Sequence, residues 1–217
     1  MSIITVFGIP GSPFLRSVEI TLKEKGLDYQ LQAVKPGEHK QPEYLARHPF
    51  GRVPAFEHDS FTIYETQAII RYIDEVFPSP PLTPGNPRAR ARMNQVIGII
   101  EWYYFPKAGA PIGFNRIIGP RLLGVPADEQ AVADAMPMAR TCFAEFDQLL
   151  GDKPYLTGDT VTLADIMLGA QLDLFMECPE GRELMAETSH LSAWLERMAA
   201  RPSFAATQPP AMLKEAA

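Results

Sequence analysis

The sequence predicts two domains of different class, an α/β domain followed by an all-helical domain. The ten residues Pro78–Pro87 hold five prolines and a glycine, so neither a helix nor a β-ladder can run through them. Before this segment short β-branched runs alternate with helical patterns, and after it apolar residues recur at helical spacing. We therefore expect an α/β domain over residues 1–77, a linker over 78–87 and a helical domain over 88–217.

The elements of the first domain are predicted in the order βαβ and then ββα. The apolar, β-branched run over 3–7 is typical of a buried strand, and Gly8 ends it. Ser12 is a good N-cap for a helix over 13–25. The remaining elements are strands over 29–33, 55–57 and 61–64, the last two as a hairpin, and a helix over 65–76.

Helical periodicity dominates the second domain. It predicts helices near 88–107, 126–150, 162–177 and 189–200. Pro137 lies inside the second of these and predicts a kink or a break. Thr162 and Asp165 have the spacing of a capping box at the start of the third, so we interpret Asp165 as a folding residue rather than a catalyst.

Composition limits the classes of partner and the compartment. Of 217 residues, 46% are hydrophobic, enough for a buried core, and the formal net charge is −6. With an acidic balance and no basic run, nucleic acid is not expected as a partner, and without a run of eighteen apolar residues neither is a membrane. The N-terminus lacks the pattern of a secretion signal, so we expect a cytoplasmic protein. Cys142 and Cys178 match no metal-ligand spacing and are expected to be reduced, buried thiols.

Two turns of the first domain offer hydrogen-bond donors to a ligand. The turn Gly8–Ser12 leads from a strand into a helix, where unpaired N–H groups and the helix dipole favour an anion such as a thiolate. The Ser12 hydroxyl can donate to the same anion, although a serine at this place is more often only a cap. Val53 precedes Pro54, and a cis bond there would leave the Val53 N–H and C=O open to an extended peptide.

Charged residues of the same domain offer carboxylate and ammonium sites. The Glu65 carboxylate can accept a ligand ammonium, and Thr66 can bind a carboxylate, with ordinary helix capping as the alternative. His39 and Lys40 lie in a polar loop, where a cation can hold a second carboxylate unless the loop is only solvated. Taken together, these groups suit a small, anionic peptide that carries a thiol.

The ordered set of motifs identifies a family resemblance. It consists of Glu24–Tyr29, Pro36–Lys40, His48–Phe56, Tyr64–Tyr72, Leu123–Pro126, Tyr155–Asp159 and Arg201–Ser203. Through these stretches the chain resembles a glutathione S-transferase over almost its whole length, and it looks most like the phi class. The resemblance implies a thioredoxin-like first domain packed on an all-helical second domain. Since no cysteine lies near Ser12, thiol-redox chemistry is not expected there.

The resemblance also implies roles for single residues. Ser12 would stabilise the glutathione thiolate. His39 and Lys40 would hold the glycine carboxylate, Val53 before cis-Pro54 would pair with the cysteinyl part, and Glu65 and Thr66 would bind the γ-glutamyl end. The family often has glutamine in place of Arg52, which either grips a carboxylate or points to solvent, and serine in place of Thr66, which keeps the hydroxyl.

Aromatic residues are the candidates for the rest of the site. The resemblance implies an electrophile pocket between the domains, with Phe14, Trp102, Tyr103, Phe105 and Phe114 as its candidate lining. Aromatics at helical spacing are more often core, which is the alternative. Family members are usually homodimers, and Phe50 is a candidate anchor into the partner unless its contact is intramolecular.

The expected function is therefore that of a glutathione transferase. Ser12 would ionise the glutathione thiol, which would then add to a hydrophobic electrophile, with no metal and no redox cofactor. Peroxide reduction, dehalogenation or isomerisation with glutathione at the same site remain as alternatives. A non-catalytic carrier or stress-associated binding protein of the same fold is the alternative from another class.

Overall fold

The computed structural model describes residues 3–213, which form two compact units. The first unit comprises the chain up to Pro81 together with Pro202–Pro209. The second comprises Leu82–Arg201 and the chain from Pro210 onward. The C-terminal part of the chain therefore contributes to both units.

The first unit is built on a four-stranded mixed sheet with the strand order β2-β1-β3-β4. Its strands are β1 (Ile4–Gly8), β2 (Gln30–Ala33), β3 (Ala55–His58) and β4 (Phe61–Tyr64). β1 runs parallel to β2 and antiparallel to β3, and β3 runs antiparallel to β4. The predicted order, βαβ and then ββα, is confirmed.

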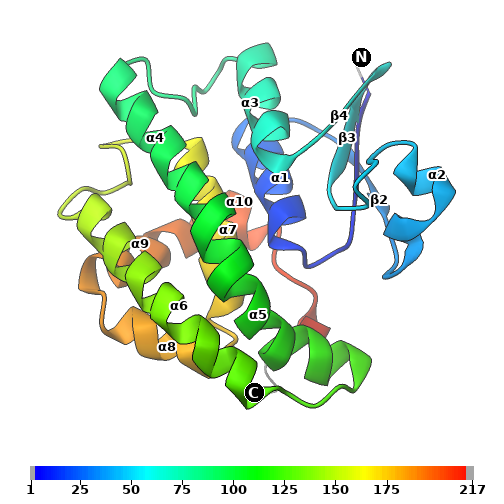
Figure 1. Ribbon diagram of the computed structural model, residues 1–217. Helices are drawn as coiled ribbons and strands as arrows, with labels where there is room; N and C mark the ends of the chain where they lie inside the picture. Colours follow the sequence, from blue (N-terminus) through cyan, green and yellow to red (C-terminus); the bar gives the residue numbers. More distant parts are fainter. Residues whose placement is uncertain (1–2, 214–217) are drawn as a thin grey trace. The chain divides into compact units, whose positions relative to one another are not determined.

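Helices cover both faces of this sheet. α1 (Pro13–Glu24) and α3 (Thr66–Val76) lie on one face, and the short α2 (Pro42–Leu45) lies on the other (Figure 1). Before α2 comes a single 3₁₀ turn, η1 (Glu38–Lys40), and neither was predicted. On the α2 face, Tyr44 packs into a small core with Val34 and Ala55.

The C-terminal return to the first unit is fixed on α1. Arg16, which is buried, donates to the carbonyl of Phe204 (3.3 Å) and to the hydroxyl of Thr207 (3.4 Å). Its guanidinium also lies over the Phe204 ring, 5.2 Å from the centroid. These contacts hold α10 (Pro202–Ala205) against α1, because a buried guanidinium without partners would be costly.

The second unit is helical, as predicted. Its elements are α4 (Pro87–Ile99), η2 (Ile100–Gly109), α5 (Ala110–Gly113), η3 (Phe114–Leu123), α6 (Glu129–Leu150), α7 (Leu163–Phe175), α8 (Pro179–Ala186), α9 (Ser189–Ala199) and η4 (Ala211–Leu213). The first four follow one another without a gap, and η2 and η3 are π-helical. The sequence analysis missed the helical segment over 110–123 and helix α8.

The predicted break at Pro137 is absent, since α6 continues unbroken from Glu129 to Leu150. Proline removes the hydrogen bond to the residue four positions earlier, which here is Ala133. Both residues are exposed, so solvent can satisfy the freed carbonyl. The opposite face of α6, which carries the buried Phe143 and Phe146, is undisturbed.

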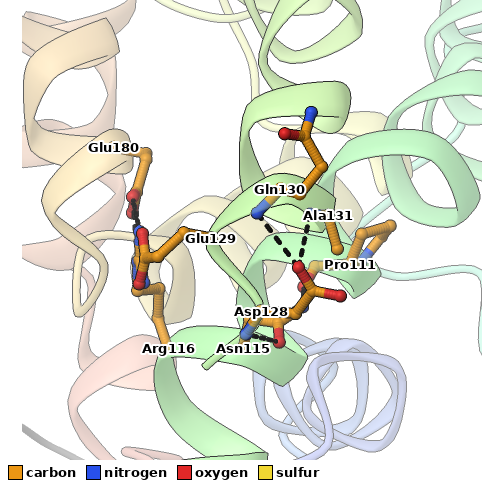
Figure 2. A network of polar contacts seen from close by, with 8 residues as sticks. All are labelled: Pro111, Asn115, Arg116, Asp128, Glu129, Gln130, Ala131 and Glu180. Carbon is orange, nitrogen blue, oxygen red and sulfur yellow. Dashed lines mark hydrogen bonds and ion pairs between the residues drawn. The ribbon is translucent and has the colours of Figure 1, made fainter. Parts of the chain in front are cut away.

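A polar network fixes the start of α6 (Figure 2). The Asp128 carboxylate caps the helix by accepting from two N–H groups of its first turn, and the Asp128 N–H donates to the Asn115 side chain (2.9 Å). Arg116 makes ion pairs with Glu129 and Glu180, each at 2.7 Å. This arginine thereby connects η3 with α6 and α8.

Asp165 is the polar centre of the second unit. It is fully buried and completes the predicted capping box with Thr162, whose N–H donates to it at 2.9 Å. It also accepts from the N–H of Leu156 (2.9 Å) and from the indole N–H of Trp194 (3.0 Å). One carboxylate therefore connects α7 with a loop and with α9, which confirms its interpretation as a folding residue.

We predict that Asp165→Ala lowers the free energy of unfolding by about 3–5 kcal/mol, because several buried donors lose their acceptor. Chemical denaturation followed by circular dichroism measures this change. The control is Asp159→Ala, an exposed aspartate of the preceding loop, which should change stability by less than about 0.5 kcal/mol. Equal effects of both substitutions would contradict the prediction.

Candidate functional site

The strand order brings the predicted site residues to one edge of the sheet. Gly8 pairs with Ala33, Phe7 with Ala55, and Ala55 with Tyr64, so β1, β2 and β4 end where β3 begins. The loops at this edge carry Ser12 after β1, His39 and Lys40 after β2, Arg52, Val53 and Pro54 before β3, and Glu65 and Thr66 after β4.

Ser12 is the N-cap residue of α1 and is half-buried. The hydroxyl oxygen accepts from the N–H of Leu15 at 3.4 Å, so the predicted cap is present but long. The Ser12 N–H donates to the carbonyl of Ile9 at 3.0 Å, which fixes the turn. No acceptor within residues 3–213 takes the hydroxyl proton. Ser12 can therefore donate that proton to an anion at the helix N-terminus.

Lys40 is held against the loop that leads to β3. Its Nζ donates to the carbonyl of Gly51 at 2.8 Å. Gly51 has φ +56°, and a Cβ at this position would lie 2.9 Å from the His39 carbonyl and 3.1 Å from the Lys40 Nζ. Only glycine allows this approach, so the backbone at Gly51 fixes the position of the lysine cation.

The two cations Lys40 and Arg52 act on a neutral histidine. Burial, followed by the charges of Lys40 and Arg52, lowers the pKa of His39. Its Nδ1 accepts from the N–H of Gly37 at 3.3 Å, which leaves the proton of the neutral ring on Nε2. Arg52 is exposed, and its guanidinium makes no hydrogen bond or ion pair within the described part of the chain.

Val53 presents an unused peptide group at this edge. Its bond to Pro54 is cis, as the family resemblance implies. Its side chain packs against the core formed by Val34, Tyr44 and Ala55. Neither its N–H nor its C=O is hydrogen-bonded to any residue in the range 3–213. An extended ligand can therefore pair with this main chain.

Glu65 adopts a backbone conformation that ordinary helix capping does not explain. Its φ is +72° and its ψ is 114°, outside the regions that non-glycine residues favour. The side chain is exposed and caps no N–H of α3. Such conformations cost about 1–3 kcal/mol and occur at functional sites. The next residue, Thr66, is buried, and neither its N–H nor its hydroxyl is bonded within the described residues.

We predict that Glu65→Gly raises the free energy of unfolding of the unliganded protein by about 1 kcal/mol, because glycine adopts a positive φ without strain. Denaturant titration measures the change. Glu65→Gln keeps the strained backbone and should leave stability within about 0.5 kcal/mol of the wild type. If glycine destabilises the protein, the backbone at this position is not strained.

His48 is the residue of this region that sequence reasoning overlooked. It was noted only as part of a motif, yet its side chain is 2% exposed and its ring lies 4.7 Å from that of Tyr64. Its Nδ1 has no hydrogen-bond partner in the part of the chain that the structure describes. A histidine between a short helix and a proline gives no sequence signal of burial, since its nearest ring neighbour, Tyr64, lies on strand β4.

The candidate aromatic residues belong to different units, Phe14 to the first and the other four to the second. Trp102 is 73% exposed, and Tyr103 and Phe114 are also exposed, so these three are not core residues. Phe14 and Phe105 are half-buried. The core aromatic of η2 is instead Tyr104, whose ring packs with those of Phe143, Phe146 and Phe175.

Phe50 lies at the surface of the first unit. Its ring meets those of His48 and Tyr64 edge-on, at 6.3 and 6.1 Å between centroids, yet it remains 67% exposed. The intramolecular contact therefore covers only part of the ring.

The two cysteines, possible metal ligands and possible membrane-spanning helices concern the remaining expectations. Cys142 and Cys178 are free, buried thiols, and burial raises their pKa values to about 11 and about 12. Among residues 3–213, no group of three or more His, Cys, Asp or Glu side chains is arranged to hold a metal ion. No described helix combines the length and the apolar character needed to cross a membrane.

Comparisons with known proteins agree with the resemblance seen in the sequence. Residues 2–75 match the family model of the glutathione S-transferase N-terminal domain, and residues 129–197 match that of the C-terminal domain. Glutathione S-transferase F6 of Arabidopsis thaliana is 34% identical over 94% of this chain and 98% of its own length. Glutathione S-transferase 3 of Zea mays is 32% identical over 95% of this chain and 94% of its own.

Solved structures give the same result for the fold. The crystal structure of glutathione transferase F7 from Populus trichocarpa matches with a TM-score of 0.86 and 31% identity, covering 94% of this chain and 97% of that one. The theta-class enzyme from Xanthomonas axonopodis pv. citri, which was solved with glutathione bound, matches with a TM-score of 0.84 and 26% identity, covering 98% and 100%.

Proposed function

Because the chain belongs to the glutathione S-transferase family and is an enzyme with glutathione transferase activity, we propose that Ser12 activates the glutathione thiol for addition to a hydrophobic electrophile. The observation that carries the proposal is the sheet edge described above. It combines a hydroxyl free to donate, an unpaired main-chain peptide and charges of both signs.

In the proposed mechanism the serine acts as a hydrogen-bond donor and keeps its proton. The glutathione thiol loses its proton to solvent, and the Ser12 hydroxyl and the N-terminal dipole of α1 stabilise the thiolate that remains. One charge-assisted hydrogen bond contributes roughly 1.5–3 kcal/mol, which corresponds to about one or two pKa units. The thiolate then forms a carbon–sulfur bond with the electrophile, whose leaving group or displaced electron pair takes up the charge.

The charged and main-chain groups support one orientation of the tripeptide. Glu65 accepts the γ-glutamyl ammonium, and the free donors of Thr66 receive the neighbouring carboxylate. Val53 pairs with the cysteinyl main chain. His39, Lys40 and Arg52 surround the glycine carboxylate, where Lys40 is fixed by Gly51 and neutral His39 donates from Nε2. In this orientation the thiol lies between the γ-glutamyl end and the glycine end of the tripeptide. Ser12 follows β1, which lies between β2 and β3, so its hydroxyl is also between the two ends.

The apolar co-substrate is assigned to the aromatic residues. Trp102, Tyr103 and Phe114 support this part of the proposal because exposed rings offer contact area to an apolar ligand. Phe14 and Phe105 are included as half-buried members of the same set. We also propose a homodimer in which Phe50 inserts into the partner, since two-thirds of this aromatic side chain stays uncovered.

Ser12→Ala is expected to raise the thiol pKa of bound glutathione by about one or two units, with binding changed only a few-fold. A pH titration of the ultraviolet thiolate absorbance of the complex measures the pKa. Ser12→Gly is the matched control for capping, because glycine at an N-cap costs only a few tenths of a kcal/mol. Both variants should give the same thiol pKa, whereas an unshifted pKa in either would assign activation to another group.

Glu65→Gln is expected to weaken glutathione binding by roughly 2–3 kcal/mol, about 30- to 150-fold in Kd, because the ammonium loses its charged acceptor. Isothermal titration calorimetry measures the affinity. Glu75→Gln, an exposed glutamate at the other end of α3, is the control and should bind as the wild type does. Equal affinities for all three proteins would move the γ-glutamyl site elsewhere.

A further inference from the structure

We propose that His48 is a positioning residue for glutathione. The His48 ring sets the distance between the two ends of the binding site. The inference rests on the glutathione site proposed above and goes beyond it, because His48 touches neither end directly. One end consists of Glu65 and Thr66, and the other of Lys40 and Arg52.

The main chain of His48 is fixed on both sides. Its N–H donates to the carbonyl of Tyr44 in α2 at 3.0 Å. Its carbonyl accepts from the N–H of Gly51 at 2.8 Å. Gly51 in turn presents its own carbonyl to the Lys40 Nζ at 2.8 Å. His48 is therefore connected to the carboxylate-binding end of the site through a single residue.

The ring of His48 is connected to the other end of the site, Glu65 and Thr66, also through a single residue. It packs against Tyr64 at 4.7 Å between centroids, and Tyr64 directly precedes the strained Glu65. Tyr44 stacks with the His48 ring at 6.5 Å, and Phe50 meets it edge-on at 6.3 Å. Because the ring is fully enclosed, a shift of the loop over 48–54 relative to β4 must displace it.

The packing requires the neutral ring. Its Nδ1 is buried and lacks a partner within residues 3–213, so a proton there would have nothing to bond. The charged groups that face it are Glu65 at the start of α3, Arg52 of the loop and Lys40 of η1, while α2 and β4 contribute only the tyrosine rings. Burial is the main cause that lowers the pKa of His48. The Glu65 carboxylate raises the pKa, whereas Arg52 and Lys40 lower it.

The sign of the pH dependence follows from this arrangement. When the pKa of a histidine is lowered in the folded state, the folded state loses stability as the pH falls below the ordinary histidine pKa of about 6.5. Protonation adds a third positive charge beside Lys40 and Arg52 and loosens the contact with Tyr64. Glutathione affinity should therefore fall on acidification, whereas the pKa of the bound thiol, set at Ser12, should not change.

Three variants test the proposal. His48→Ala removes the ring, His48→Phe keeps an aromatic ring that cannot be protonated, and His58→Ala is the matched control. The His58 ring also lies among aromatic side chains, with its Nε2 buried and 3.9 Å from the Asp59 carboxylate, but it is at the opposite end of the same sheet. Calorimetry gives the Kd of glutathione between about pH 5.5 and pH 7.5, and ultraviolet titration gives the pKa of the bound thiol.

We expect His48→Ala to raise Kd by about tenfold or more at neutral pH, with an unchanged thiol pKa, and His48→Phe to restore Kd to within about threefold of the wild type. The wild type should lose affinity as the pH falls below about 6.5, and His48→Phe should not. Wild-type affinity in His48→Ala, or an acid loss in His48→Phe equal to that of the wild type, overturns the proposal.

The outcomes separate this inference from the proposed function. If the wild type binds no glutathione, the site itself fails, whatever His48 does. If the wild type binds glutathione and His58→Ala weakens binding as much as His48→Ala, the effect is general loss of stability and His48 has no positioning role. Should His48→Ala fail to fold, His48→Asn, which keeps a polar side chain without a ring, takes its place with the same expected result.

Discussion

The antiparallel pairing of β3 with both β1 and β4 is the constraint on which the site depends. Through Phe7, Ala55 and Tyr64 it aligns the end of β1, the start of β3 and the end of β4 in one row. A shift of one residue would turn every side chain of a strand to the opposite face. Ala55 and Phe56 are both fully buried, each against a different face of the sheet, so such a shift would be strongly unfavourable. The register that buries the core therefore also sets the spacing of the site.

Much of the site consists of groups that folding leaves unpaired. Within the residues described, the main chain of Val53, the N–H of Thr66 and the hydroxyl proton of Ser12 all lack a partner that the protein itself could supply. Glu65 adds backbone strain to this set. The surrounding structure tolerates these costs because the sheet and the two helices behind it over-determine the loop conformations. The stability of the sheet core thus maintains a preorganised edge that a ligand can satisfy.

The sequence predicted this edge better than it predicted the helical unit. Caps and turn residues such as Ser12 and Gly8 are local signals, and they gave the four strands, α1 and α3 nearly to the residue, but not η1 or α2. Two kinds of feature escaped. The helix predicted near 88–107 stops short, since the chain stays helical to Leu123, and the π-helical turns of η2 place Tyr104 rather than its neighbours in the core. His48 escaped because its burial depends on Tyr64, a contact that no local pattern encodes.

The two cations of the site differ in what they contribute to binding. Lys40 is held by Gly51, so it meets a carboxylate with little loss of side-chain entropy. Arg52 is exposed and unpaired within the described residues, so its attraction acts through solvent and weakens as salt increases. Burial is the main cause that lowers the pKa of both His39 and His48, and the charge of Arg52 lowers both further. The arginine therefore acts on the charge state of the site as well as on the ligand, which a glutamine at the same position would not do.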